Sequence, residues 1–188
     1  MYGRLAALQA QVMADERVDV ACTRGCSYCC HLRVEIRPHE AFVLAHHIRT
    51  QFSPAQGLRI LARIEDNLAR LASLSPEQHV RAGIPCALLQ DDTCSVYEAR
   101  PATCRKYHSV SVVVCRAAFD DTSAPLIGDI EHEQVRLAGN AVALGYAKGV
   151  EEAGYDARLY ELHHALHRAF TDPKAERRYR RGKRAFVG

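Results

Sequence analysis

The chain has 188 residues, of which 48% are hydrophobic and 25% charged, and its formal net charge is +3 at pH 7. This length suffices for one compact core, and the composition is that of a globular rather than a disordered protein. The small net charge does not indicate a polyanionic partner for the whole surface. No apolar stretch reaches the roughly 18 to 20 residues that span a bilayer, and the N-terminal segment lacks a signal-peptide core. We therefore expect a cytoplasmic protein without a membrane partner.

Helical periodicity dominates the first half of the chain. Residues 1–17 carry apolar residues at helical spacing, and residues 38–50 begin with a proline and continue with the same spacing. Ser53 followed by a proline is typical of a helix start. Ser75 lies three residues before a glutamine, which is the spacing of a capping box. The sequence therefore predicts helices that begin near residues 38, 54 and 76.

The middle third of the chain, residues 84–128, lacks this periodicity. Its one plausible strand is the β-branched run at residues 110–114. A helical face returns from about Ile130 and continues until Gly154, and another follows over residues 159–170. The sequence therefore predicts an irregular region between two sets of helices.

The predicted elements indicate an all-α fold. Asp172 and Pro173 are typical of the cap of a short last helix. We expect a single helical metal-binding domain over residues 1–172, with an irregular cysteine-rich insert organised by metal. Residues 173–188 are expected to form a basic C-terminal helix or tail.

Four of the eight cysteines stand close together in the segment ACTRGCSYCCH. They are Cys22, Cys26, Cys29 and Cys30. On a helix they would lie along one stripe, whereas in a turn the pair separated by two residues would form a metal knuckle, and the sequence leaves both forms open. Gly25 would let the chain turn between the first two thiols. Since crowded cysteines in a reducing compartment more often bind metal than form disulfides, this quartet is predicted to bind metal.

The other four cysteines fall in the irregular middle region. They are Cys86, Cys94, Cys104 and Cys115. Spacing alone favours a ligand role for the first three and leaves Cys115 open between a ligand and a small buried thiol. A zinc ion and a cubane iron–sulfur cluster each take about four thiolates. Eight cysteines therefore allow two sites, a polynuclear cluster, or one metal with additional thiols.

Basic residues near the cysteines have two interpretations. Arg100 and Arg105 could offset the negative charge of a multi-thiolate site, or they could face solvent or pair with Glu98. The basic run at residues 177–184 could meet nucleic-acid phosphates, but such a run is more often solvated or docked on an acidic patch. We therefore expect a metal ion rather than nucleic acid as the partner.

Histidines offer weaker candidates. His31 and His108 lie close to cysteines in the sequence and could serve as ligands or as donors that orient ligands. His163 and His167 have the spacing of a helical metal pair but lack the glutamate of a metalloprotease motif. A helix edge beside the apolar stripe fits this pair better.

The segments CTRGCSYCC and PCALLQDDTCSVYEARPATCR resemble the YkgJ-like CxxCxxCC cysteine-cluster family, which is described as zinc- or iron-chelating. The later segment YELHHALHRAF resembles a helix in one branch of that family, so the resemblance covers most of the chain. One departure is that three residues, not two, separate the first two cysteines, a spacing that one branch shares. The resemblance implies a ligand role for the later cysteines, Cys86, Cys94, Cys104 and Cys115.

Metal chelation is the function that this resemblance implies, without a settled activity. Relatives among the protein-modifying lysine methylases carry a related cysteine domain associated with an iron–sulfur cluster. We expect zinc as the cofactor, with iron or an iron–sulfur cluster as the alternative. The competing hypothesis is an iron–sulfur enzyme or redox protein. The sequence indicates no catalytic residue and no protein partner.

Overall fold

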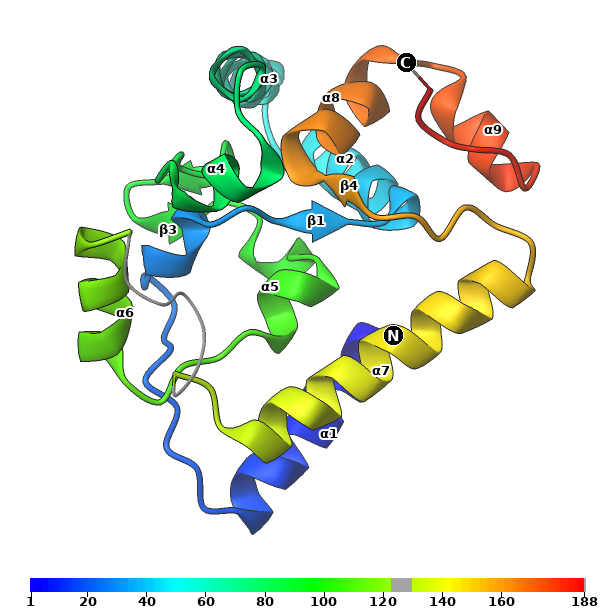
Figure 1. The fold of residues 1–188 in the computed structure, drawn as a ribbon. Coiled ribbons are helices and arrows are strands. Elements are labelled where there is room, and N and C mark those ends of the chain that lie inside the picture. The colour runs from blue at the N-terminus through cyan, green and yellow to red at the C-terminus, as the bar shows by residue number, and fades with distance from the viewer. Residues whose placement is uncertain (123–129, 188) are drawn as a thin grey trace.

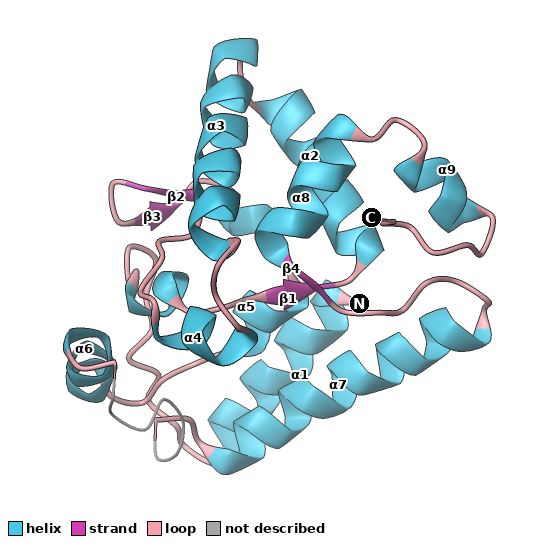
Figure 2. Cartoon of the chain, turned by 45° about the horizontal axis from the view of Figure 1, so that its top comes forward, coloured by secondary structure: helices cyan, strands magenta, loops and turns pink. Residues whose placement is uncertain are grey.

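The computed structural model describes residues 1–122 and 130–187. Within this part of the chain it contains nine α-helices and four very short strands, so the predicted all-α class is confirmed (Figure 1). The strands form two separate antiparallel pairs (Figure 2). None of the described helices has the length and apolar character needed to cross a membrane.

The main hydrophobic core lies among four helices. They are α2 (Pro38–Gln51), α3 (Pro54–Leu71), α8 (Leu162–Thr171) and α9 (Ala175–Arg180). Helix α8 packs against both α2 and α3, and its Leu162 and Leu166 are fully buried. The helix positions predicted near residues 38 and 54 are confirmed, because apolar side chains at helical spacing face one shared core. The helix predicted over residues 159–170 begins only at Leu162, since Leu159 is exposed and the next two residues pair as strand β4 (Tyr160–Glu161).

Local capping explains where the predicted helices begin. The Ser53 hydroxyl accepts a hydrogen bond from the Gln56 N–H at 3.3 Å, and the Gln56 side chain accepts one from the Ser53 N–H at 2.8 Å. Ser75 and Gln78 repeat this arrangement at the start of α4 (Pro76–Arg81). Each capping box satisfies backbone N–H groups that the helix itself leaves unpaired.

A second layer consists of α1 (Tyr2–Asp15) and α7 (Glu133–Glu152), which lie side by side (Figures 1 and 2). Gly139 permits this approach, since a Cβ there would lie only 2.9 Å from the Gln9 side chain. Gln9 is buried, and its Nε2 donates to the Lys106 carbonyl at 2.9 Å. Because Lys106 ends α5 (Ala102–Lys106), this bond attaches the helix pair to the middle region.

Each strand pair joins two segments of the chain, one pair across a long sequence separation and the other across a tight turn. Strand β1 (Glu35–Ile36) pairs with β4 (Tyr160–Glu161), which joins the segment before α2 to the start of α8. Strand β2 (Leu89–Gln90) pairs with β3 (Thr93–Cys94) in a hairpin. The two aspartates of its turn have φ angles of 49° and 56°, a left-handed conformation that aspartate tolerates better than most residues.

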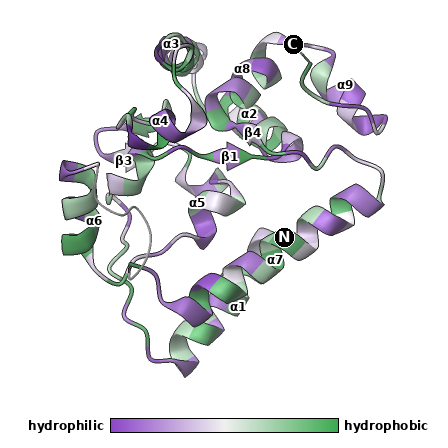
Figure 3. Ribbon diagram, in the orientation of Figure 1, coloured by the Kyte–Doolittle hydropathy of each residue, from purple (hydrophilic) through white to green (hydrophobic). Residues whose placement is uncertain are grey.

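The predicted strand at residues 110–114 is wrong. Helix α6 (Val112–Asp120) occupies this region, and the Ser111 hydroxyl caps it by accepting a hydrogen bond from the Val114 N–H at 3.3 Å. The first turn of α6 is hydrophobic (Figure 3). Phe119 packs on the short 3₁₀ helix η1 (Tyr28–His31), so the cap and this contact override the β propensity of the valines.

The rest of the middle region is less irregular than predicted. Besides α6 it contains α5 and the 3₁₀ helix η2 (Tyr97–Ala99). The predicted irregular segment at residues 123–128 lies outside the described residues. The predicted helix from about residue 130 begins at Glu133 and ends before Gly154, which has a φ of +79°.

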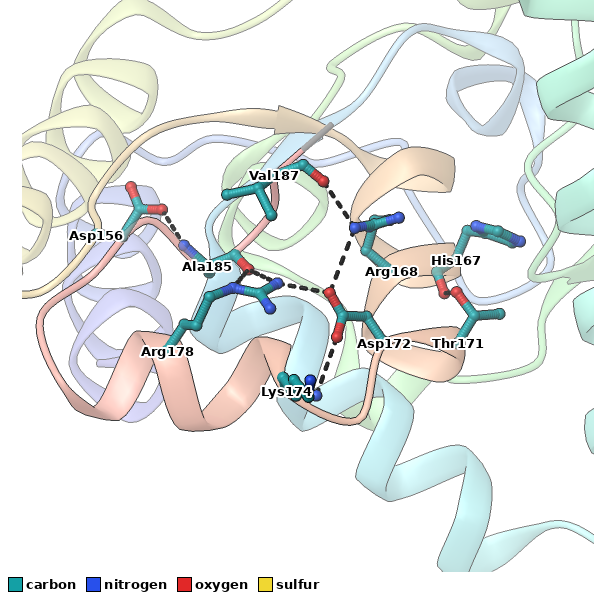
Figure 4. Close-up of polar contacts among 9 residues, drawn as sticks. All are labelled: Asp156, His167, Arg168, Thr171, Asp172, Lys174, Arg178, Ala185 and Val187. Atoms are coloured by element: carbon teal, nitrogen blue, oxygen red, sulfur yellow. Dashed lines mark hydrogen bonds and ion pairs between the residues drawn. The ribbon is translucent and has the colours of Figure 1, made fainter.

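The C-terminal segment folds back on the core (Figure 4). Arg178 donates to the Asp172 carboxylate at 2.6 Å and to the Ala185 carbonyl at 2.6 Å. Ala185 and Phe186 are buried. The domain boundary at residue 172 stays a prediction. The bonds of Arg178 and the burial of Ala185 and Phe186 show that the C-terminal segment packs against the rest of the chain.

Candidate metal centre

Seven of the eight cysteines line one cavity with a volume of about 90 Å³. They are Cys22, Cys26, Cys29, Cys30, Cys86, Cys94 and Cys104. The first four belong to the segment after α1, and the other three belong to the middle region, to the loop before β2, to β3 and to α5. The fold therefore brings both predicted cysteine groups to the same space, whereas their role as ligands stays a prediction.

The N-terminal quartet adopts a turn rather than one helical stripe. Gly25 has a φ of +97°, and the Cys26 N–H donates to the Thr23 carbonyl at 3.1 Å. Cys29 and Cys30 lie in η1, where the Cys30 N–H donates to the Ser27 carbonyl. The sequence left both a helical stripe and a turn open for this quartet, and the structure has the turn.

Backbone hydrogen bonds join the quartet to the middle region. The Cys86 N–H donates to the Cys30 carbonyl at 2.8 Å, and the Ala21 N–H donates to the Ser109 carbonyl at 2.7 Å. The Ser109 N–H in turn donates to the Cys22 sulfur at 3.1 Å. These contacts hold segments more than 50 residues apart in register around the cavity.

Helix α3 holds the loop that carries Cys86. Arg63 donates from Nε to the Ala87 carbonyl, and Asn67 donates from Nδ2 to the Pro85 carbonyl, each at 2.8 Å. The two side chains stand four residues apart and thus share one face of the helix. Nothing in the sequence pattern of α3 singles out this role, because the partners are backbone atoms of a remote loop.

His163 on α8 holds the same loop. Its Nδ1 lies 2.7 Å from the Glu161 carboxylate and donates to it, so Nε2 accepts from the Ala87 N–H at 3.3 Å and from the Asn67 amide at 3.0 Å. Burial alone would raise the pKa of Glu161, but hydrogen bonds from His163 and His164 hold it well below the ordinary value. The expectation of a simple helix edge is wrong for His163, which is buried.

Burial makes three thiols of the cavity, those of Cys22, Cys86 and Cys104, poor acids in the absence of a cation. Burial raises the pKa of Cys22 to about 11 and that of Cys86 to about 12. Neighbouring sulfurs add to the shifts, Cys29 beside Cys22 and Cys94 beside Cys86. Burial also raises the pKa of Cys104. A bound cation would reverse this balance, since it stabilises the thiolate form.

Arg100 is the cationic side chain at the cavity within the described part of the chain. Its guanidinium lies 3.5 Å from the centre of the Tyr97 ring, and its Nε donates to the Tyr97 carbonyl. Arg105 instead lies over the Tyr2 ring and donates to the Arg100 carbonyl at 2.6 Å. Of the two arginines expected to offset thiolate charge, the structure places only Arg100 where it can do so.

Cys115 lies outside the main cavity. It lines a smaller cavity of about 40 Å³ on α6, and the two cavities share Cys29 and Tyr107. The sequence pattern offered no signal for Tyr107. Tyr107 lies at the boundary between the two sets of thiols because it lines both cavities, and burial and the nearby sulfurs, Cys115 foremost, raise its pKa.

Neither histidine proposed near the cysteines lines the main cavity. His31 lies 3.1 Å from the Ser27 carbonyl through Nδ1, and its ring packs edge-on against Phe119. His108 is buried and accepts a hydrogen bond from the His132 N–H at 3.0 Å. Both rings are therefore engaged in packing and hydrogen bonding elsewhere.

The donor set of the cavity fits a thiophilic metal. Seven sulfurs surround it, and soft thiolates are ligands for zinc and for iron–sulfur clusters. Among residues 1–122 and 130–187, however, no three His, Cys, Asp or Glu side chains are arranged to hold one ion. The sulfurs surround a common space rather than a single point.

One comparison with known proteins gives a match. Residues 21–126 match the CxxCxxCC family, whose description reads "putative zinc- or iron-chelating domain". This segment contains all eight cysteines, and no curated protein or solved structure matches the chain. The match does not distinguish the YkgJ-like branch. Since it extends over more than half of the sequence, the chain belongs to the CxxCxxCC family.

Proposed function

We propose that this protein binds zinc or iron through its cysteine cavity and uses the metal to hold the N-terminal cysteine segment against the middle region. The observation that carries the proposal is the meeting of seven cysteines from remote segments around one cavity. Cys115 completes the proposed ligand set from the adjoining cavity. Membership of a family described as zinc- or iron-chelating supports the same function.

The dimensions of the cavity favour a centre with more than one metal atom. A single zinc ion takes four ligands, with sulfur at about 2.3 Å. Seven thiols exceed that number, and a volume of about 90 Å³ leaves room for several heavy atoms between them. The geometry thus supports either a zinc–thiolate cluster or an iron–sulfur cluster.

The two metals would give the protein different chemistry. A closed zinc–thiolate centre is structural and redox-inert, whereas an iron–sulfur cluster transfers electrons. Arg100 would offset negative charge in both cases, because its guanidinium stands at the cavity. A cytoplasmic location fits this proposal, because a reducing compartment keeps cysteines available as metal ligands.

Purification under anaerobic conditions tests the proposal directly. The measurements are zinc, iron and acid-labile sulfide per chain, together with the visible absorption spectrum. Stoichiometric zinc in a colourless sample would support the zinc–thiolate centre, and a brown sample with iron and sulfide would support the iron–sulfur centre. A folded protein that retains neither metal, before or after reconstitution, would refute chelation.

A further inference from the structure

A larger cavity, of about 630 Å³, lies away from the cysteines and joins α7 to the C-terminal segment. We name it the basic groove, and its walls come from α7, from the loop at residues 155–158, from the residue before α2, and from Gly182 and Arg184. Its volume is within the range of roughly 300 to 1,000 Å³ that small-molecule sites have. No cysteine lines it, so it is separate from the proposed metal centre.

Positive charge predominates in the basic groove. Its charged lining residues are Arg37, Lys148, Arg158, Arg184, Glu151 and Asp156. The Asp156 side chain is only 1% exposed. Its carboxylate accepts hydrogen bonds from the Ala185 N–H at 2.9 Å and the Tyr160 hydroxyl at 2.8 Å. The Asp156 carboxylate is therefore occupied by hydrogen bonds within the wall of the groove. The side chains that line the groove still carry more positive than negative charge.

Two of these cations lack a carboxylate partner within residues 1–122 and 130–187. Arg158 pairs with Asp156 at 3.2 Å, and Lys148 pairs with Glu152 on the helix surface at 3.3 Å. No ion pair joins Arg37 or Arg184 to a carboxylate among the residues that the structure describes. The Nε of Arg37 is buried and has no hydrogen-bond partner in that part of the chain. A guanidinium whose Nε–H lacks an acceptor can donate a charged hydrogen bond to an anion.

One wall of the groove is held in place by packing between two backbone segments. Gly154 and Gly182 both have positive φ angles, and a Cβ at Gly182 would lie 2.6 Å from the Gly154 carbonyl. The two loops thus pack backbone to backbone. Arg178 holds the next stretch of the C-terminal segment through the Ala185 carbonyl (Figure 4).

One aromatic ring faces the groove. Tyr155 is 42% exposed, and its ring stacks on Tyr179 at 5.3 Å with an interplanar angle of 29°. A ring held in this way offers a flat apolar surface beside the cations, and bases stack on such surfaces. We propose that the basic groove binds a nucleoside phosphate, with the phosphate at Arg37 and Arg184 and the base on Tyr155.

Calorimetric titration of the full chain as purified tests this proposal with adenosine monophosphate, adenosine and inorganic phosphate as probes. We expect the nucleotide to bind more tightly than either of its parts. Arg37→Gln should weaken nucleotide binding by about tenfold or more, as the loss of a charged hydrogen bond predicts. The matched control is Arg59→Gln, an exposed arginine on α3 outside the groove, and it should bind like the unaltered chain.

A second variant separates the two parts of the ligand. Tyr155→Leu should bring the affinity for adenosine monophosphate close to that for inorganic phosphate, while circular dichroism shows unaltered helicity. Equal affinity for adenosine and its monophosphate would overturn the proposal, and so would the absence of nucleotide binding. Binding of a polyuridylate strand that adenosine monophosphate cannot displace would also overturn it, in favour of a nucleic-acid surface. Removal of metal from the cysteine cavity should leave these affinities unchanged, so the two proposals fail independently.

Discussion

The loop that carries Cys86 provides a test of how the fold presents a cavity thiol. His163→Ala removes the imidazole that accepts from the Ala87 N–H and donates to Glu161. The backbone N–H next to Cys86 is then left without its partner, and the nearly buried Glu161 carboxylate loses one donor. The variant should lower both the stability of the fold and the retention of metal.

The size of the effect follows from the contacts. A buried polar group left unpaired costs about 1–3 kcal/mol, which applies to the Ala87 N–H, and a lost hydrogen bond to a charged group costs about 1.5–3 kcal/mol, which applies to Glu161. The total loss of unfolding free energy should therefore be about 2.5–6 kcal/mol, a large share of the 5–15 kcal/mol of an ordinary domain. His167→Ala is the matched control, because its contact with Glu65 is long, at 3.7 Å, and partly exposed. That change should cost no more than about 1 kcal/mol.

Urea unfolding of the metal-loaded protein measures the stability, and competition with a chelator measures metal retention by the metal content that stays bound to the chain. His163→Ala should release metal at a lower chelator concentration than His167→Ala does. Equal unfolding free energies for the two variants would refute the reasoning about the buried network. A stability loss with unaltered metal retention would show that the network supports the fold but does not position Cys86.

Three further changes test other parts of the structure. Cys104→Ser should lower the metal content per chain more than Cys115→Ser, since only Cys104 lines the main cavity; elemental analysis measures both, and equal losses would contradict the ranking. The lowered pKa of Glu161 means that its stabilising charge is fully present above its ordinary value of 4.5 and is lost as the pH falls below it. Unfolding free energies measured between pH 6 and 3 should therefore decline less steeply in Glu161→Gln, and an unaltered slope would contradict the assignment. Ser111→Ala should destabilise α6 by about 1 kcal/mol through loss of its cap, measured by urea unfolding, and an unchanged midpoint would argue against the cap.

Local chemistry made much of the fold predictable. Ser53 and Ser75 begin helices through side chains that bond to N–H groups three residues away, and such bonds require no distant partner. The apolar stripes of α3 and α8 likewise follow from spacing alone. The cysteine quartet was evident for the same reason, because all its members lie within one short segment.

Propensity without tertiary context was misleading at residues 110–114. The valines favour a strand when considered alone, whereas the Ser111 cap and the contact of Phe119 with η1 give a helix. The role of His163 was missed for a related reason. Its partners, Ala87 and Asn67, are remote in sequence and adjacent only after α3 and α8 have packed.

The sequence by itself determined the helical class, the starts of α2, α3 and α4 and the supply of thiols, since each depends on residues a few positions apart. Only the tertiary structure decided that seven of the cysteines share one cavity and that Cys115 and Arg105 lie outside it. It also decided that Arg184, from the C-terminal basic run, lies in the wall of a groove. These arrangements depend on contacts between remote segments, which form when helices bury their apolar faces together and which no local pattern encodes.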